Sequence, residues 1–149
     1  MNNRILGLDI GDRRIGVALS DITKTIANPL EVINLGHGTD IFASLKKIIE
    51  LHEVSTVILG LPKNMDGTLG PQARKVTDFG ETLKGLFPDK EIDYFDERLS
   101  TRQALRTLIE ADMSRARRKK VVDKVSAVII LQGYLETLNF KRHKEEQGT

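Results

Sequence analysis

The chain has 149 residues, of which 40% are hydrophobic and 30% are charged, and it contains neither cysteine nor tryptophan. That length predicts one domain over residues 1–149, and the lack of cysteine excludes a disulfide framework, a thiolate metal site and a cysteine nucleophile. No apolar run is long enough to span a membrane, and no signal segment begins the chain. We therefore expect a cytoplasmic protein without a membrane partner.

The pattern of hydrophobic residues predicts a hairpin followed by alternating helices and strands. The expected elements, in chain order, are strands at 4–10, 14–20 and 25–32, a helix after Asp40, a strand at 56–60, a helix from Pro71 to about Leu86, a strand at 92–95, a helix from Ser100 to about Ala111 and a final helix at 121–138. This order indicates an α/β fold with a mixed sheet of about five strands and helices on both faces. Residues 141–149 are expected to form a flexible tail.

The net charge of +2 hides an uneven distribution along the chain. Residues 1–97 contain 11 Lys and Arg against 15 Asp and Glu, whereas residues 98–144 contain 12 against 4. Five of the six residues 115–120 are basic. A run this dense is typical of a surface that binds a polyanion, so we expect nucleic acid as the partner.

Three carboxylates lie where they could act together. Asp9 falls within an apolar strand, where a charge is unfavourable unless a cation or a hydrogen bond compensates it. Glu97 follows the strand at 92–95, at the edge where α/β sheets bind ligands. Asp123 lies in the first turn of the expected final helix, on the same face as the small residue Ser126, so this face can approach Asp9 closely.

Carboxylates without histidine or cysteine are typical ligands of hard divalent cations. Two such ions about 4 Å apart can hold the attacking water and the leaving oxygen of a phosphodiester. We therefore expect Asp9, Glu97 and Asp123 to be the metal ligands and catalytic residues of a two-metal endonuclease, with Asp9 bridging the ions. The residues alone do not decide between Mg²⁺ and Mn²⁺.

Two of these carboxylates also have a structural interpretation. Asp123 occupies a position where the helix dipole favours an acid, and Glu97 could form a surface ion pair with Arg98 or Arg102. Asp9 is harder to explain in this way, because its neighbours on both sides are apolar.

Basic and polar side chains near these acids are candidates for holding a nucleic-acid strand, although each is also compatible with a solvent-facing surface. The candidates are Arg13, Arg14, Lys63, Asn64, Arg98, Arg102, Arg115, Arg117, Arg118, Lys119 and Lys120. Lys63 and Asn64 belong to a polar loop that can move over a bound strand. Phosphate neutralisation predicts binding that weakens steeply with salt.

Four segments of the chain resemble the motifs of the YqgF/RuvX family. They are residues 8–18 (LDIGDRRIGVA), 60–70 (GLPKNMDGTLG), 96–101 (DERLST) and 122–132 (VDKVSAVIILQ). The family comprises Holliday junction resolvases and nucleases that mature the 16S ribosomal RNA precursor, and its fold is ribonuclease H-like. The resemblance implies this fold here, with the acidic metal-binding roles on Asp9, Glu97 and Asp123.

Three interpretations of function stay open. The first is an endonuclease acting on an RNA precursor, as a monomer, or on branched DNA, where two cuts favour a dimer. The second is a nucleic-acid-binding factor in transcription or ribosome biogenesis with little or no cleavage, although such a factor gains nothing from acids beside phosphates. The third is a lobe of an actin-like ATPase, which the Asp-x-Gly turn at Asp9 resembles, but those enzymes need two lobes.

Overall fold

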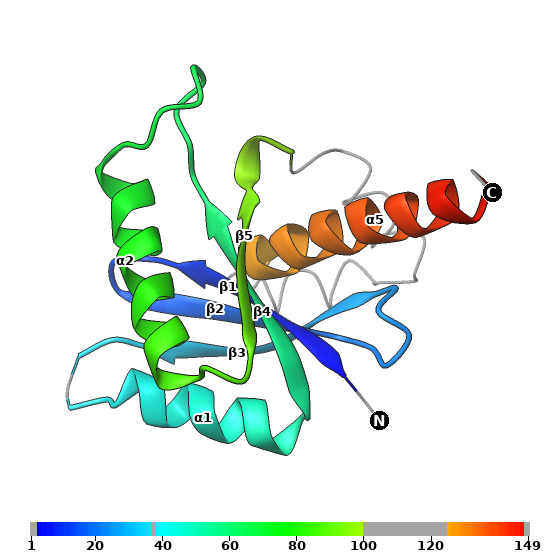
Figure 1. Cartoon of the computed structure of the whole chain (residues 1–149). Helices are drawn as coiled ribbons and strands as arrows, with labels where there is room; N and C mark the ends of the chain where they lie inside the picture. Colours follow the sequence, from blue (N-terminus) through cyan, green and yellow to red (C-terminus); the bar gives the residue numbers. More distant parts are fainter. Residues whose placement is uncertain (1–2, 37, 100–124, 148–149) are drawn as a thin grey trace.

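The computed structural model describes residues 3–36, 38–99 and 125–147 (Figure 1). Several features expected from the sequence lie outside these ranges. They are the helix at 100–111, the basic run at 115–120, the start of the final helix, and the candidate residues Arg102 and Asp123.

Five strands form one mixed sheet in the order β3-β2-β1-β4-β5 (Figure 1). β1 (Arg4–Ile10), β2 (Arg14–Ser20) and β3 (Ala27–Asn34) are antiparallel neighbours, and β4 (Val54–Leu61) and β5 (Glu91–Asp96) run parallel to β1. β1 and β4 are almost continuously apolar because both are covered on two faces. The predicted mixed sheet is confirmed.

Helices cover both faces of the sheet, as predicted (Figure 1). α1 (Ile41–Leu51) and α2 (Pro71–Leu86) pack on one face, and α5 (Val125–Gln147) packs on the other. Asp40 caps α1, since its Oδ1 accepts a hydrogen bond from the Ala43 N–H at 3.1 Å. Proline opens α2 at a position where its missing N–H has no helical partner to lose.

The alternation of side chains along the strands assigns residues to the two faces. In β1, Leu6, Leu8 and Ile10 point into the core shared with α1 and α2, whereas Ile5 packs against α5. Asp9 is two pleats beyond Ile5 and therefore lies on the α5 face. The same period places Glu97, which is two residues past Phe95, on that face.

Two strand glycines let α5 lie close to the sheet. A Cβ added at Gly7 of β1 would be 2.7 Å from the Leu131 Cβ, and a Cβ at Gly60 of β4 would overlap Ile130. Side chains at these positions would force the helix outward. The glycines therefore determine how near the first turns of α5 come to Asp9 and Glu97.

Gln132 fixes α5 against the start of β3. Its side chain is fully buried, its Oε1 accepts from the Ala27 N–H at 2.8 Å, and its Nε2 donates to the Thr25 carbonyl at 3.0 Å. One amide thus satisfies a buried backbone donor and a neighbouring carbonyl.

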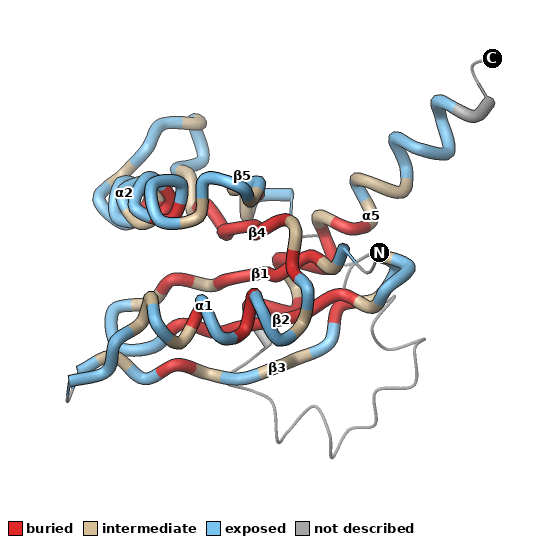
Figure 2. Tube along the Cα trace, turned by 60° about the horizontal axis from the view of Figure 1, so that its bottom comes forward, coloured by how far each residue is buried: buried red, intermediate tan, exposed pale blue. Residues whose placement is uncertain are grey.

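Several boundaries differ from the sequence-based expectation: β3 ends at Asn34 rather than at residue 32, β4 and β5 are each longer than predicted, and two further differences have a physical reason. The third strand begins at Ala27 rather than residue 25, because the Asp21 carboxylate takes the backbone N–H groups of Thr25 and Ile26. The final helix continues to Gln147, so residues 141–147 are helical and extend away from the sheet (Figure 2). This segment is rich in good helix formers, and the next glycine is Gly148.

Among the described residues, no helix combines the length and apolar character that a membrane crossing requires.

Candidate active site

Asp9 and Glu97 line one small pocket on the α5 face of the sheet. Asp9 is the penultimate residue of β1, and Glu97 is the first residue of the short 3-10 helix η1 (Glu97–Leu99) that follows β5. The pocket has a volume of about 280 Å³, and Ser126, Ile129 and Ile130 of α5 form its other wall. The structure therefore brings together two of the three predicted carboxylates.

The floor beneath Glu97 is backbone rather than side chain. A Cβ at Gly60 would lie 2.7 Å from the Glu97 Oε1. Because parallel strands β4 and β5 end side by side, with Gly60 opposite Phe95, the missing side chain of Gly60 leaves room for the carboxylate of Glu97. Strand β4 thus shapes the site without contributing a charged group.

The pocket raises the pKa of both carboxyl groups. For Asp9 the main cause is burial, which a hydrogen bond from the Ser126 hydroxyl partly offsets. For Glu97 the main cause is again burial, followed by the negative charges of Asp9 and Asp96. Within the described part of the chain, neither carboxylate forms an ion pair with a basic side chain.

These donors fit a hard divalent cation. They are oxygen atoms only, they carry two like charges in a half-buried pocket, and both charges are destabilised in the absence of a counter-charge. Among the described residues no group of three acidic, histidine or cysteine side chains is close enough to hold a metal. Asp123, the predicted third ligand, precedes Ser126 by three residues but lies outside the described ranges.

Arg98 is bound to Asp96 and not to Glu97. Its Nε lies 3.0 Å from each Asp96 carboxylate oxygen, and its Nη2 lies 2.7 Å from Oδ2. This pairing lowers the pKa of Asp96. The ion pair between Glu97 and Arg98 that the sequence left open is therefore not formed, and Glu97 stays available to the pocket.

Of the other predicted nucleic-acid-binding residues, some lie near the pocket and others lie outside the described residues. Arg13 and Arg14 are exposed at the turn between β1 and β2, immediately beyond Asp9. Lys63 and Asn64 follow β4, but the Asn64 amide is engaged with the Thr68 hydroxyl at 3.0 Å. The remaining basic candidates, Arg102 and the run from Arg115 to Lys120, lie outside the described residues.

Sequence reasoning noticed the small size of Ser126 but not its hydrogen bond to Asp9. It also missed Gln72 and Lys75 of α2, which fasten the turn after β1: the Gln72 amide donates to the Ile10 carbonyl at 3.1 Å, and the Lys75 ammonium contacts Asp12 at 2.6 Å. No local pattern could have found these contacts, because α2 and this turn are far apart in the sequence.

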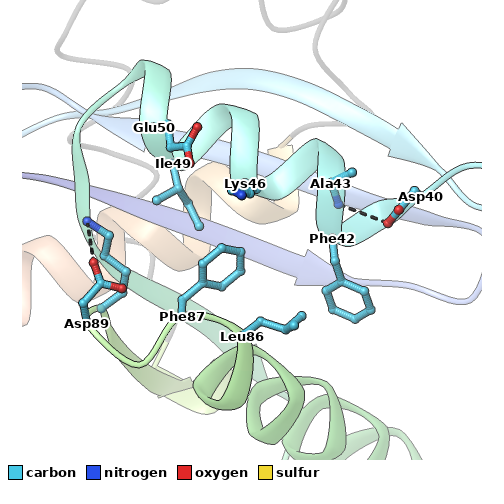
Figure 3. Close-up of a pocket in the computed structure, with 10 residues that line it drawn as sticks. Asp40, Phe42, Ala43, Lys46, Ile49, Glu50, Leu86, Phe87 and Asp89 are labelled. Carbon is cyan, nitrogen blue, oxygen red and sulfur yellow. Dashed lines mark hydrogen bonds and ion pairs between the residues drawn. The ribbon is translucent and has the colours of Figure 1, made fainter.

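A second hollow, of about 500 Å³, lies between α1 and α2 on the opposite face of the sheet (Figure 3). Phe42, Ile49, Leu86 and Phe87 supply apolar lining, and charged side chains stand at its edge, including the ion pair of Lys90 with Asp89 at 3.7 Å. It lacks the paired, uncompensated carboxylates of the first pocket.

Comparison with known proteins agrees with the family resemblance found in the sequence motifs. The family model described as RuvX, Holliday junction resolvase, matches residues 3–137. A protein of Thermoanaerobacter pseudethanolicus is 53% identical over 90% of this chain and 96% of its own length, and one of Clostridium botulinum is 50% identical over 91% and 98%. Both bear the name "Putative pre-16S rRNA nuclease".

The fold has a counterpart among solved structures. Thermus thermophilus RuvC in complex with a Holliday junction substrate superposes with a TM-score of 0.55, covering 88% of this chain and 91% of RuvC. The sequence identity is 13%, so this likeness concerns the fold, which is ribonuclease H-like as expected.

Proposed function

This chain belongs to the RuvX family of Holliday junction resolvases and is a nuclease, and we propose that Asp9 and Glu97 carry its hydrolysis of phosphodiester bonds. One observation carries the assignment: two half-buried carboxylates face the same pocket without a basic partner among the described residues. Two such carboxylates repel each other when no cation is bound, and a cation that binds between them and a phosphate relieves this repulsion.

We propose structured RNA of the 16S precursor as the first substrate, with cleavage in maturation of its 5′ end. The support is the name shared by relatives of about half-identical sequence over nearly their whole length. A four-way DNA junction is the second candidate, supported by the description of the family.

Asp9 and Glu97 would hold Mg²⁺ or Mn²⁺ through their carboxylate oxygens, and we assign Asp123 as the third ligand. When bound, such ions supply a more acidic water and a counter-charge for the leaving oxygen. Two such ions would be held by Asp9, Glu97 and Asp123 together, with Asp9 shared between them. The Ser126 hydroxyl would assist Asp9 by lowering its pKa, which favours the ionised form that binds a cation.

The basic residues would align the strand. Arg13 and Arg14 stand next to the end of β1 that carries Asp9, where they can contact phosphates on either side of the pocket. Lys63 can do the same from the end of β4. We assign the run of Arg115, Arg117, Arg118, Lys119 and Lys120 to phosphate contacts further along the strand.

A binding factor without cleavage is the alternative. It explains the basic residues equally well, but it leaves the carboxylate pocket without a role, since negative charge at the binding surface would repel phosphate. The pocket therefore favours the nuclease.

The deciding experiment is a cleavage assay with labelled 16S precursor RNA and a labelled four-way DNA junction, each with Mg²⁺ or Mn²⁺. We expect metal-dependent cutting by the wild-type protein, loss of at least 100-fold in Asp9→Asn and in Glu97→Gln, and wild-type activity in Asp89→Asn, a surface control in the turn between α2 and β5. Cleavage by Asp9→Asn at a near-normal rate under saturating metal would overturn the site assignment. Binding without cutting by the wild-type protein would favour the binding factor.

A further inference from the structure

The loop at residues 62–70, between β4 and α2, exposes two large apolar side chains, Met65 and, to a smaller extent, Leu69. Met65 is 91% exposed, the highest value of any large hydrophobic residue in the described part of the chain. The loop projects beyond the end of the sheet, beside the end of β5 (Figure 1). Single exposed hydrophobic residues are common on protein surfaces, and Met65 differs from the others in its position, because its loop contacts Arg98, the residue after Glu97.

Hydrogen bonds within the loop give it a defined shape. The Asn64 N–H donates to the Thr68 carbonyl at 2.9 Å, and the Gly67 N–H donates to the Asn64 carbonyl at 2.8 Å. Asp66 accepts from both the backbone N–H and the hydroxyl of Thr68. Gly67 has φ +87°, a left-handed conformation that glycine adopts without strain. The polar groups from Asn64 to Thr68 are thus largely used internally, and the exposed side chain between them is Met65, while Lys63 at the base of the loop is the phosphate contact proposed above.

The loop is also attached to the carboxylate pocket. The Arg98 Nη1 donates to the Met65 carbonyl at 3.3 Å, while the rest of the guanidinium holds Asp96. Arg98 directly follows Glu97, which lines the pocket. These contacts connect the Met65 backbone to the segment that carries Glu97.

We propose that Met65 packs against a nucleobase next to the scissile phosphodiester and displaces it from its neighbour in the stack. This inference rests on the proposed function. A nucleic acid at this pocket offers two kinds of group. Its phosphates would be bound by the carboxylates through a cation, and its bases would be the apolar surfaces for the tip of the loop. Methionine suits the role because its thioether is flexible and packs well on aromatic rings, and apolar side chains that enter base steps include methionine.

A protein partner is a weaker match for this feature. Docking of a protein onto an apolar surface needs a continuous patch, whereas the large apolar side chains that this loop exposes are Met65 and, to 40%, Leu69. A single protruding side chain is suited to insertion between two stacked rings.

The test uses whichever substrate the wild-type protein cleaves, carrying 2-aminopurine beside the scissile bond, with Ca²⁺ replacing Mg²⁺ to hold the complex uncut. We expect a rise in 2-aminopurine fluorescence with the wild-type protein and with Met65→Leu, and none with Met65→Ala. In Mg²⁺, Met65→Ala should lower kcat/KM about tenfold, as expected for losing one base-packing contact. Ile22→Ala, which removes a half-exposed apolar side chain remote from the pocket, is the matched control and should change neither readout.

The outcomes separate the two proposals. Wild-type cleavage with equal fluorescence and equal kcat/KM in Met65→Ala overturns the role of Met65 and leaves the nuclease site intact. A loss of activity in Met65→Ala together with a reduced Mn²⁺-induced rise in Tm would show that the loop supports the metal site, and would also overturn the base contact. No binding and no cleavage by the wild-type protein would instead reject the proposed function.

Discussion

The Ser126 hydroxyl, in the first turn of α5, donates a hydrogen bond to the carboxylate of Asp9 at the end of β1. The bond joins segments from opposite ends of the chain and opposes the rise in the pKa of Asp9 that burial causes. Asp9, Ser126 and Glu97 line the same pocket. Groups that surround a metal ligand commonly tune such a site.

The first prediction concerns metal binding by the folded protein. Mn²⁺ at about 100 times its Kd should stabilise the wild-type protein by about 2.7 kcal/mol, which raises Tm by roughly 5–10 °C for a chain of this size. Asp9→Asn should lose most of this rise, whereas Asp89→Asn should keep it. Differential scanning calorimetry with and without EDTA measures the effect. An undiminished rise in Asp9→Asn would mean that the metal binds elsewhere.

The second prediction concerns pH in the absence of metal. The pKa values of Asp9 and Glu97 are raised in the folded protein, so the folded chain holds protons that the unfolded chain has released. Stability contributed by these groups is therefore present below the ordinary carboxylate pKa and is lost as pH rises through the raised values.

Urea unfolding in EDTA tests this sign. We expect Asp9→Asn to be more stable than the wild-type protein at pH 7 and to show a smaller loss of stability between pH 4 and pH 7. If the variant is instead less stable throughout, the carboxylate is compensated in the folded protein and the electrostatic description of the pocket is wrong.

The third prediction concerns Gly60. Alanine at this position would press on Ile130 and on the Glu97 carboxylate, so Gly60→Ala should destabilise the protein by about 1–3 kcal/mol and reduce cleavage beyond the loss of folded protein. Gly85→Ala is the matched control, because a Cβ at this helical position meets no atom within 4 Å. It should be neutral or stabilising by up to about 1 kcal/mol. If Gly60→Ala and Gly85→Ala have equal effects on cleavage, Gly60 has no role in the active site.

The fourth prediction concerns the attachment of α5. Gln132→Leu keeps the volume but leaves the buried N–H of Ala27 without an acceptor, at a cost of about 1–3 kcal/mol. Asn139→Leu removes a single, part-buried bond to the Lys24 carbonyl and should cost less than 1 kcal/mol. Chemical denaturation compares the two variants. A larger loss in Asn139→Leu would place the main anchor of α5 at the hairpin between β2 and β3.

The fifth prediction concerns the basic run. Replacing Arg115, Arg117 and Arg118 by glutamine should make the slope of log Kobs against log salt on duplex DNA shallower by up to about 2.7. Each phosphate contact that is lost lowers the number of counterions released on binding, by about 0.9 per contact. Binding titrations between 50 and 200 mM salt measure the slope. An unchanged slope would indicate that these side chains face solvent in the complex.

Much of the fold follows from local sequence patterns. Asp40 and Pro71 mark the starts of α1 and α2 where the structure has them, and the apolar run in β4 predicts a strand covered on both faces. These features depend on interactions within one helix or one strand. Boundaries that depend on side-chain contacts with the backbone are harder to predict, as at Thr25, where the Asp21 carboxylate takes a backbone donor away from the sheet.

The sequence by itself also singled out Asp9 and Glu97, because a charge in an apolar strand and an acid at a strand end are local anomalies. Only the tertiary structure decided what surrounds them. That Ser126 reaches Asp9 and that Gly60 leaves space for Glu97 depend on how α5, β1, β4 and β5 pack together. The physical reason is that strand alternation and helix periodicity determine the face on which a side chain lies, whereas packing between elements determines which face it meets.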